Sequence, residues 1–199
     1  MTGRETILAA VARNRPAGEH PLPAIPRFPQ PEEGGRLATF LREHTLMGGS
    51  VITGSPETDT IERVAEKLTG TVICSAVPEI AGNRRLDEVA LPRDLADVDV
   101  AIVRAVLGVA ETGSVLFTET ELVVNTLAYL AQHLVVLLDP NDIVSGMQDA
   151  YDRPGFHRAA YAVFHTGPSG TGDIEGVLIH PAQGVRTLTV AFIPRAPER

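Results

Sequence analysis

The sequence predicts an α/β protein with a mixed, mostly parallel sheet flanked by helices. Residues 50–74 read as a strand, a helix and a second strand, a span that fits only a short right-handed crossover between parallel strands. Residues 133–139 are apolar without alternation, as expected of a strand covered on both faces. The remainder of the second half is also rich in strand-like segments. With 199 residues, 44% of them hydrophobic, the chain can bury one substantial core.

The first 32 residues differ in character from the rest. Residues 4–14 place Ile7, Leu8 and Val11 at helical spacing, and residues 16–31 contain six prolines, which cannot continue a helix. We therefore expect an N-terminal helix and a proline-rich arm over residues 1–32, followed by one α/β domain over residues 33–199.

The elements of that domain are expected in the following order. Residues 36–46 are helical and residues 50–53 form a strand. Ser55, Pro56 and Glu57 supply an N-cap, a first-position proline and an acidic first turn for a helix that ends at Leu68. Further strands are expected over residues 71–74, 98–104, 107–110, 114–117, 133–139, 160–164, 177–179 and 187–193, with a helix over 145–151.

Composition excludes several classes of function. The formal charge of −8 argues against a nucleic-acid or anionic-membrane surface. No apolar run reaches membrane-spanning length and no signal peptide is recognisable, so we expect a cytoplasmic protein without membrane insertion. The single cysteine, Cys74, cannot form an intrachain disulfide or supply the four thiolates of an iron–sulfur cluster. The histidines show no metal-ligand spacing, so no metal site is expected.

Two glycine loops stand between apolar segments. One spans residues 108–116 and contains Glu111; the other, "HTGPSGTGDIE", spans residues 165–175. In α/β sheets, ligands bind at strand ends, where loops bring backbone N–H groups together. The glycines also admit a purely structural interpretation, because they permit tight turns with positive φ.

Three segments in order, "VAETGSVLF", "HLVVLLDPNDIV" and "GPSGTGDIE", resemble the LUD domain of the lactate utilization protein C family. That family has "AETGT", an "HI-apolar" strand and "GPSRTADIE" at these places. The resemblance implies a fold like the sugar-phosphate isomerase and CoA-transferase group. It also implies a role beside iron–sulfur partner subunits in oxidising lactate to pyruvate. Two departures are visible: Gly170 stands where the family has arginine, and residues 180–184 replace a "GVHGP" turn.

The two loops together are predicted to form one wall of a shared cleft at the strand ends for a small carboxylate or phosphate. Its binding residues would be Thr112, Gly113, Ser114, Gly167, Ser169, Thr171, Asp173 and Arg104. Arg104, or alternatively Arg186, is expected to pair with Glu111. CoA-transferase relatives use a glutamate in a similar turn as nucleophile, which makes Glu111 the candidate catalytic residue; its other interpretation is a solvent-exposed loop carboxylate.

Two classes of function follow. In the first, the chain is a non-redox subunit that carries no cofactor itself, binds a small organic acid or docks onto iron–sulfur subunits. In the second, it is a stand-alone isomerase or acyl-CoA-transferase-like enzyme that uses Glu111. The absence of cysteine ligands and of a dinucleotide fingerprint favours the first class.

Overall fold

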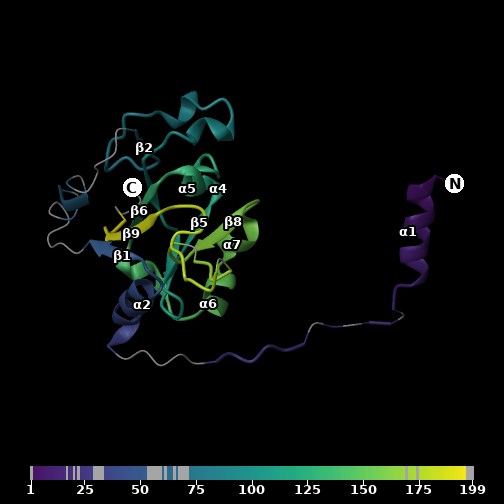
Figure 1. Cartoon of the computed structure of the whole chain (residues 1–199). Helices are drawn as coiled ribbons and strands as arrows, with labels where there is room; N and C mark the ends of the chain where they lie inside the picture. The colour runs from purple at the N-terminus through teal and green to yellow at the C-terminus, as the bar shows by residue number, and fades with distance from the viewer. Residues whose placement is uncertain are drawn as a thin grey trace.

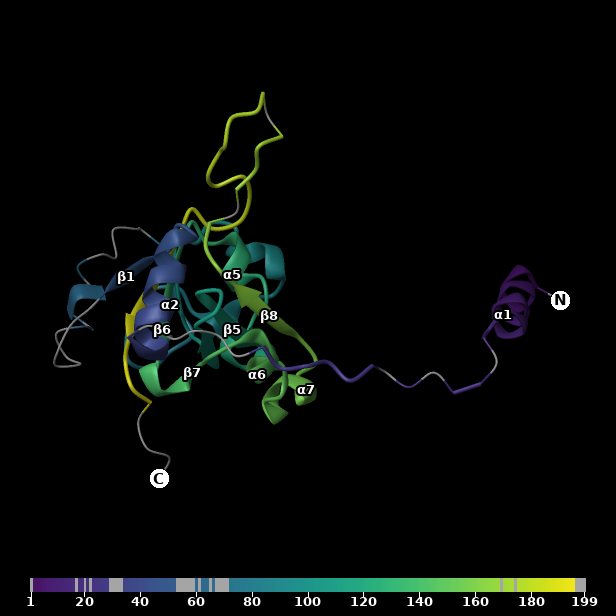
Figure 2. The ribbon, with the colours of Figure 1, turned by 90° about the horizontal axis from the view of Figure 1, so that it is seen from below.

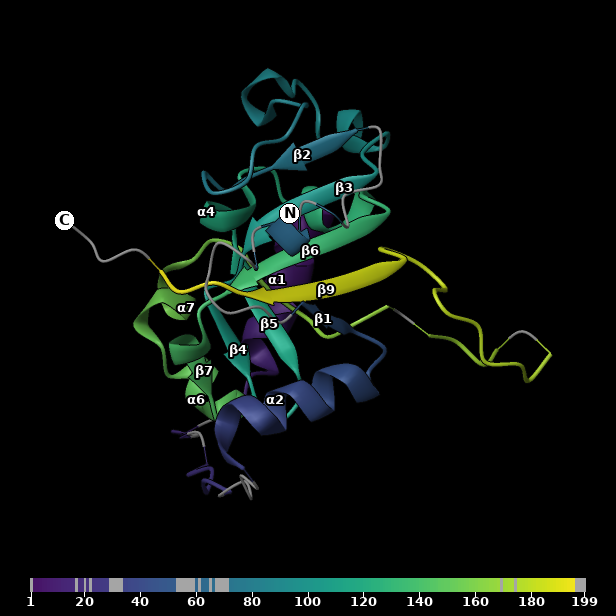
Figure 3. The same cartoon turned by 90° about the vertical axis from the view of Figure 1, so that its left-hand side faces the viewer.

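The backbone of the domain forms two sheets that pack against each other. A computed structural model describes residues 2–16, 18–19, 21, 23–28, 34–52, 60, 62–64, 66, 72–168, 170–173 and 175–195. The first sheet has the strand order β1 (Ser50–Ile52), β9 (Thr187–Phe192), β6 (His133–Leu138), β3 (Val100–Arg104) and β2 (Ile73–Ser75). Every neighbouring pair in it is parallel (Figure 3). The predicted mostly parallel α/β fold is confirmed.

The antiparallel pairs are gathered in the second sheet. Its order is β7 (Ile143–Val144), β4 (Leu107–Val109), β5 (Ser114–Thr118) and β8 (Ala162–His165). Strand β5 is antiparallel to both of its neighbours, whereas β4 and β7 are parallel. This sheet carries both glycine loops, because one joins β4 to β5 and the other follows β8.

The main core lies between the two sheets. On β6, Leu134, Val136 and Leu138 belong to this core, together with Val115 and Phe117 of β5. The intervening residues of β6 pack in a separate cluster on the opposite face of the parallel sheet. Strand β6 is therefore apolar on both faces, which explains its uninterrupted run of apolar residues.

Short helices cover the remaining surfaces. Helix α2 (Gly35–Leu46) closes the core with Phe40, while α6 (Met147–Tyr151) and α7 (Pro154–Arg158) cover the outer face of the second sheet. Helices α4 (Glu119–Leu122) and α5 (Leu127–Leu130) follow β5, and single 3₁₀ turns occupy Leu86–Glu88, Pro92–Leu95 and Pro140–Asp142. Of the helix expected over residues 55–68, the opening lies outside the described residues, and residues 60, 62–64 and 66 are helical. In the described part of the chain no helix has the length and apolar character needed to cross a bilayer.

The predicted strand over residues 177–179 is wrong. In its place a single bridge joins Thr171 to Ile179, and residues 170–184 form an excursion that projects from the body (Figure 2). In the part of the chain that the structure describes, the bridge has no further strand beside it, and Val177 and Leu178 are 60% and 67% exposed.

The N-terminal helix α1 (Gly3–Arg13) stands apart from the body (Figure 1). None of its residues is buried. The arm behind it touches the body where Arg27 forms ion pairs with Asp149 and Asp152, and where Gln148 donates a hydrogen bond to the Pro26 carbonyl. The division into residues 1–32 and 33–199 stays a prediction.

Candidate functional site

The two glycine loops meet at one end of the second sheet. Val115 of β5 lies opposite His165 of β8. The turn before β5 and the loop after β8 therefore leave the sheet side by side. Thr112 Oγ1 donates a hydrogen bond to Ser114 Oγ at 2.8 Å, and Ser114 Oγ lies 2.8 Å from Thr166 Oγ1. We call residues 110–114, 165–168 and 44–49 the motif junction.

The end of α2 packs directly onto one glycine from each loop. Gly113 has φ +65°, and a Cβ there would lie 2.2 Å from the backbone N of His44. A Cβ on Gly167 would lie 2.4 Å from the Met47 carbonyl oxygen. Both positions thus require glycine, Gly113 for its conformation as well as for space. The structural interpretation of these two residues is sufficient to explain them.

His44 is a buried residue of the motif junction that the sequence analysis missed. Its ring stacks on Phe40 with centroids 5.4 Å apart, and Nδ1 lies 2.8 Å from the Gly113 carbonyl oxygen. Burial lowers the His44 pKa, against the opposing effects of the Gly113 and Ser50 backbone. Its Nε2 is buried and forms no hydrogen bond within the described structure. The available signal was the four-residue spacing from Phe40, which places His44 on the apolar face of the helix.

The Glu111 carboxylate is bound on the β7 side of the second sheet, at the start of α6. Its Oε2 accepts a hydrogen bond from the backbone N–H of Met147 at 2.9 Å, and its own N–H donates to the Ser145 carbonyl. Met147 follows β7, which is one edge of the sheet, whereas β8 is the other edge. The carboxylate is therefore held at the start of α6, and Glu111 is an exposed residue.

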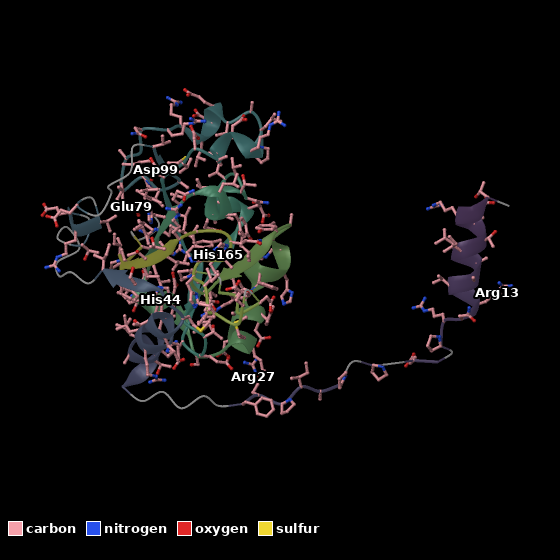
Figure 4. All side chains as sticks on the ribbon, viewed as in Figure 1. Arg13, Arg27, His44, Glu79, Asp99 and His165 are labelled. Atoms are coloured by element: carbon pink, nitrogen blue, oxygen red, sulfur yellow. The ribbon has the colours of Figure 1, made fainter. Side chains whose placement is uncertain are left out.

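The expected pairing of Arg104 with Glu111 is wrong. Arg104 ends β3, where it donates to the Ile193 carbonyl at 2.9 Å and forms an ion pair with Glu79. Its side chain is 12% exposed. Strand β4 separates Arg104 from Glu111, so the two residues lie at opposite ends of that strand. Figure 4 shows Glu79 well away from His44 and His165.

The remaining predicted residues lie on the excursion or outside the described chain. Thr171 exchanges two backbone hydrogen bonds with Ile179, and its Oγ1 accepts one from the Asp173 N–H. Ser169 falls outside the described residues. A Cβ on Gly170 would lie 2.3 Å from His180 Cε1, so the imidazole occupies the space that the family's arginine side chain would enter.

A pocket of about 410 Å³ opens beside the motif junction, and we call it the β8 pocket. Its walls come from the end of β8, from α5, from Met47 and from the two ends of the excursion. Thr166 and Gly167 of the motif junction also line it. The lining residues that the structure describes include no Lys, Arg, Asp or Glu.

His165 and Tyr129 give the β8 pocket its polar chemistry. Burial lowers the pKa of His165 to about 4, so the ring is neutral at pH 7. It packs against Tyr129 and Phe117, with ring centroids 5.0 and 5.4 Å away, and its Nε2 is buried without a hydrogen bond to the described residues. The Tyr129 hydroxyl forms a hydrogen bond with the Tyr161 hydroxyl. An uncharged pocket of this kind suits an apolar or neutral group better than a bare anion.

The described residues present no obvious ligand set for a metal ion. Within those residues, no group of three or more His, Cys, Asp or Glu side chains is arranged to hold a metal ion. Cys74 is free and buried, and burial raises the pKa of its thiol.

The chain is an α/β protein in which a parallel sheet packs against a second, mostly antiparallel sheet. Its two glycine turns meet under one helix, α2. The LUD domain model matches residues 53–193, and the chain belongs to the LUD domain family. A similar solved structure is a DUF162 family protein from Deinococcus radiodurans, with 12% sequence identity and a TM-score of 0.60. That match covers 79% of this chain and 95% of the other, and it supports the fold alone. No curated protein matches this sequence.

Proposed function

We propose that this chain is a non-redox accessory subunit of a cytoplasmic system that oxidises L-lactate to pyruvate. The observation that carries the proposal is the LUD domain assignment over residues 53–193. The family resemblance of the two glycine loops and of the segment between them points to the same system. Iron–sulfur clusters would reside in the partner subunits onto which this chain docks.

The chemistry of the reaction supports this division of labour. Conversion of lactate to pyruvate releases two electrons and two protons, which need a carrier. The chain has one cysteine, and that thiol is buried, whereas a cluster normally takes four thiolates. Electron transfer is therefore assigned to the partners, and this chain is assigned a role in assembly or in organic-acid binding.

A small organic acid, if bound here, would be received at the motif junction. Ser114 Oγ accepts a hydrogen bond from Thr112 Oγ1, and either hydroxyl of the Ser114–Thr166 pair can be the donor; when Ser114 donates, the Thr166 hydroxyl proton is left for a ligand. Thr166 lines the β8 pocket, so this donor would face an entering carboxylate. Neutral donors of this kind bind an anion weakly, which fits an accessory role better than a high-affinity substrate site.

Reconstitution tests the proposal. Lactate-dependent reduction of a dye is measured with purified iron–sulfur subunits, with this chain, and with both. We expect the rate to rise when this chain is added and to be absent with this chain alone. Thr166→Val should reduce the gain if an organic acid binds there, whereas Thr120→Val, at an exposed position on α4 outside the predicted site, serves as a matched control. Equal rates with and without the chain would refute the accessory role.

One observation favours a second candidate, a stand-alone acyl-CoA-transferase-like or isomerase activity. The backbone N–H of Met147 holds the exposed Glu111 carboxylate in one place, as a nucleophile would require. In this case the purified chain would exchange acyl-CoA groups without partners, and Glu111→Gln would abolish the exchange while leaving the fold intact.

A further inference from the structure

Helix α1 presents an apolar stripe that no described residue of the body covers. Ile7, Leu8 and Val11 are 65%, 51% and 64% exposed. A capping box between Thr2 and Glu5 closes the start of the helix. Isolated helices of about this length are marginal in water, and most of their stability in proteins comes from packing an apolar face. A helix so well capped and so fully exposed is expected to be covered by another surface.

Charge separates α1 from the rest of the molecule. Residues 2–16 carry Arg4, Arg13 and Arg15 against one acidic residue, Glu5, whereas the whole chain has a formal charge of −8. The segment is thus basic and the body strongly acidic. Attraction between unlike charges therefore favours docking of α1 onto the acidic body of this chain or of another copy of it.

The β8 pocket offers a matching surface. Its walls include Met47 and Tyr129, which are 49% and 38% exposed, and no charged side chain among the lining residues described. The excursion that begins and ends at the pocket adds the exposed Val177 and Leu178. Between residues 170 and 184 the excursion also carries Asp173 and Glu175 but no lysine or arginine. An uncharged pocket beside an acidic, partly apolar excursion complements an apolar stripe that has Arg4 and Arg13 near its two ends.

The arm sets how far α1 can reach. Arg27 anchors it to α6 through Asp149 and Asp152, and residues 14–26 run from that anchor to the helix. A proline-rich segment of this length spans up to about 40 Å, which is enough to reach a neighbouring molecule. In Figure 1 the arm leads α1 away from its own body. Reciprocal exchange of the helix would bury two such faces and close a symmetric dimer.

We propose that α1 of one copy of this chain docks into the β8 pocket of a second copy, and that α1 of the second copy docks into the β8 pocket of the first. The apolar stripe of α1 fills the pocket, and its arginines face the carboxylates of the excursion. The interface does not depend on the accessory role proposed above, but a helix docked in the β8 pocket would exclude an organic acid from it.

Light scattering after size exclusion tests the exchange on the full chain. We expect a dimer whose dissociation constant rises at least about tenfold in Val11→Glu, because a buried valine contributes at least that much. Leu178→Glu should weaken the dimer in the same way. Ala9→Glu adds the same charge on the opposite face of α1, where Ala9 is exposed, and should leave the dimer unchanged. All three substitutions are at exposed positions, so the body should stay folded.

A photo-crosslinking residue at position 11 identifies the docking surface. We expect a product of twice the chain mass, with the crosslink mapped to residues 163–185. A monomer at all concentrations, a dimer insensitive to Val11→Glu, or a crosslink within a single chain would each overturn the proposal. Capture of α1 by a different protein while the chain itself stays monomeric would also overturn it.

Discussion

Gly113 shows how a single residue can join a sequence motif to the fold. Its φ of +65° is unfavourable for other residues, and a Cβ would meet the His44 backbone. Gly113→Ala should therefore lower the free energy of unfolding by about 2 kcal/mol or more. Urea denaturation measures the loss. Gly172→Ala is the control, because that position is open and lacks a positive φ. Equal midpoints for the two variants would show that the junction adapts to a Cβ.

His165 should make stability depend on pH. Its folded pKa of about 4 lies below the usual value of 6.5, so the unfolded state binds the proton more readily between these values. The contribution to stability is full above pH 6.5 and is lost as the pH falls toward 4, by up to about 3 kcal/mol. Unfolding by urea at several pH values should therefore show a flatter acid slope in His165→Leu.

A matched control separates this effect from general acid denaturation. His157→Leu removes an exposed histidine, and we expect its acid slope to follow that of the unaltered chain. If His165→Leu also followed it, the buried imidazole would not be the titrating group.

Only some residues of the candidate site could be predicted from the sequence. The two glycine loops were predictable from their composition, and Ser114 and Thr166 do meet. Glu111 and Arg104 were grouped because they are close in sequence, but β4 carries them to opposite ends. His165 was visible as the first residue of its loop, whereas its burial against Tyr129 depends on α5, which sequence reasoning did not detect.

At the scale of elements, α4 depends on its N-cap, Thr118, which is also the last residue of β5. Thr118 Oγ1 donates to the Glu121 carboxylate and accepts from the Thr120 N–H, forming a capping box at the point where β5 becomes a helix. Thr118→Ala should lower the free energy of unfolding by about 1 kcal/mol. Thr120→Ala, an exposed change in the same turn, should cost little. Thermal melts compare the two, and a reversed order would contradict the cap.

Element length decides what the sequence could predict. Strands β3, β6 and β9 have five or six residues and were predicted within two residues of their ends. Strand β7 has two residues and α4 and α5 have four each, too few to show a period. The apolar run at residues 177–179 resembled a strand, but among the residues that the structure describes it pairs only through the single bridge from Ile179 to Thr171.

At the scale of the whole molecule, the division into two sheets is a long-range property. The strand patterns predicted parallel and antiparallel pairs together but not their separation. Strand β9 pairs with β1 across the whole domain, and β8 pairs with β5 across α4 to α7. Such pairings depend on which faces become buried together, and a local pattern of apolar residues carries no information about that.

The last prediction concerns the N-terminal segment and the body as separate units. Since α1 contributes no buried residue to its own body, limited trypsin digestion should cut first after Arg13 and leave a folded core, because trypsin does not cleave the bond between Arg15 and Pro16. At low protein concentration, the trimmed and intact chains should unfold at the same temperature. At higher concentration only the intact chain should gain stability, because only it can exchange helices and dimerise. Calorimetry across a concentration series measures both effects. If trimming abolished cooperative unfolding even in dilute solution, residues 1–13 would belong to the folding unit of residues 33–199, and the predicted boundary after residue 32 would be wrong.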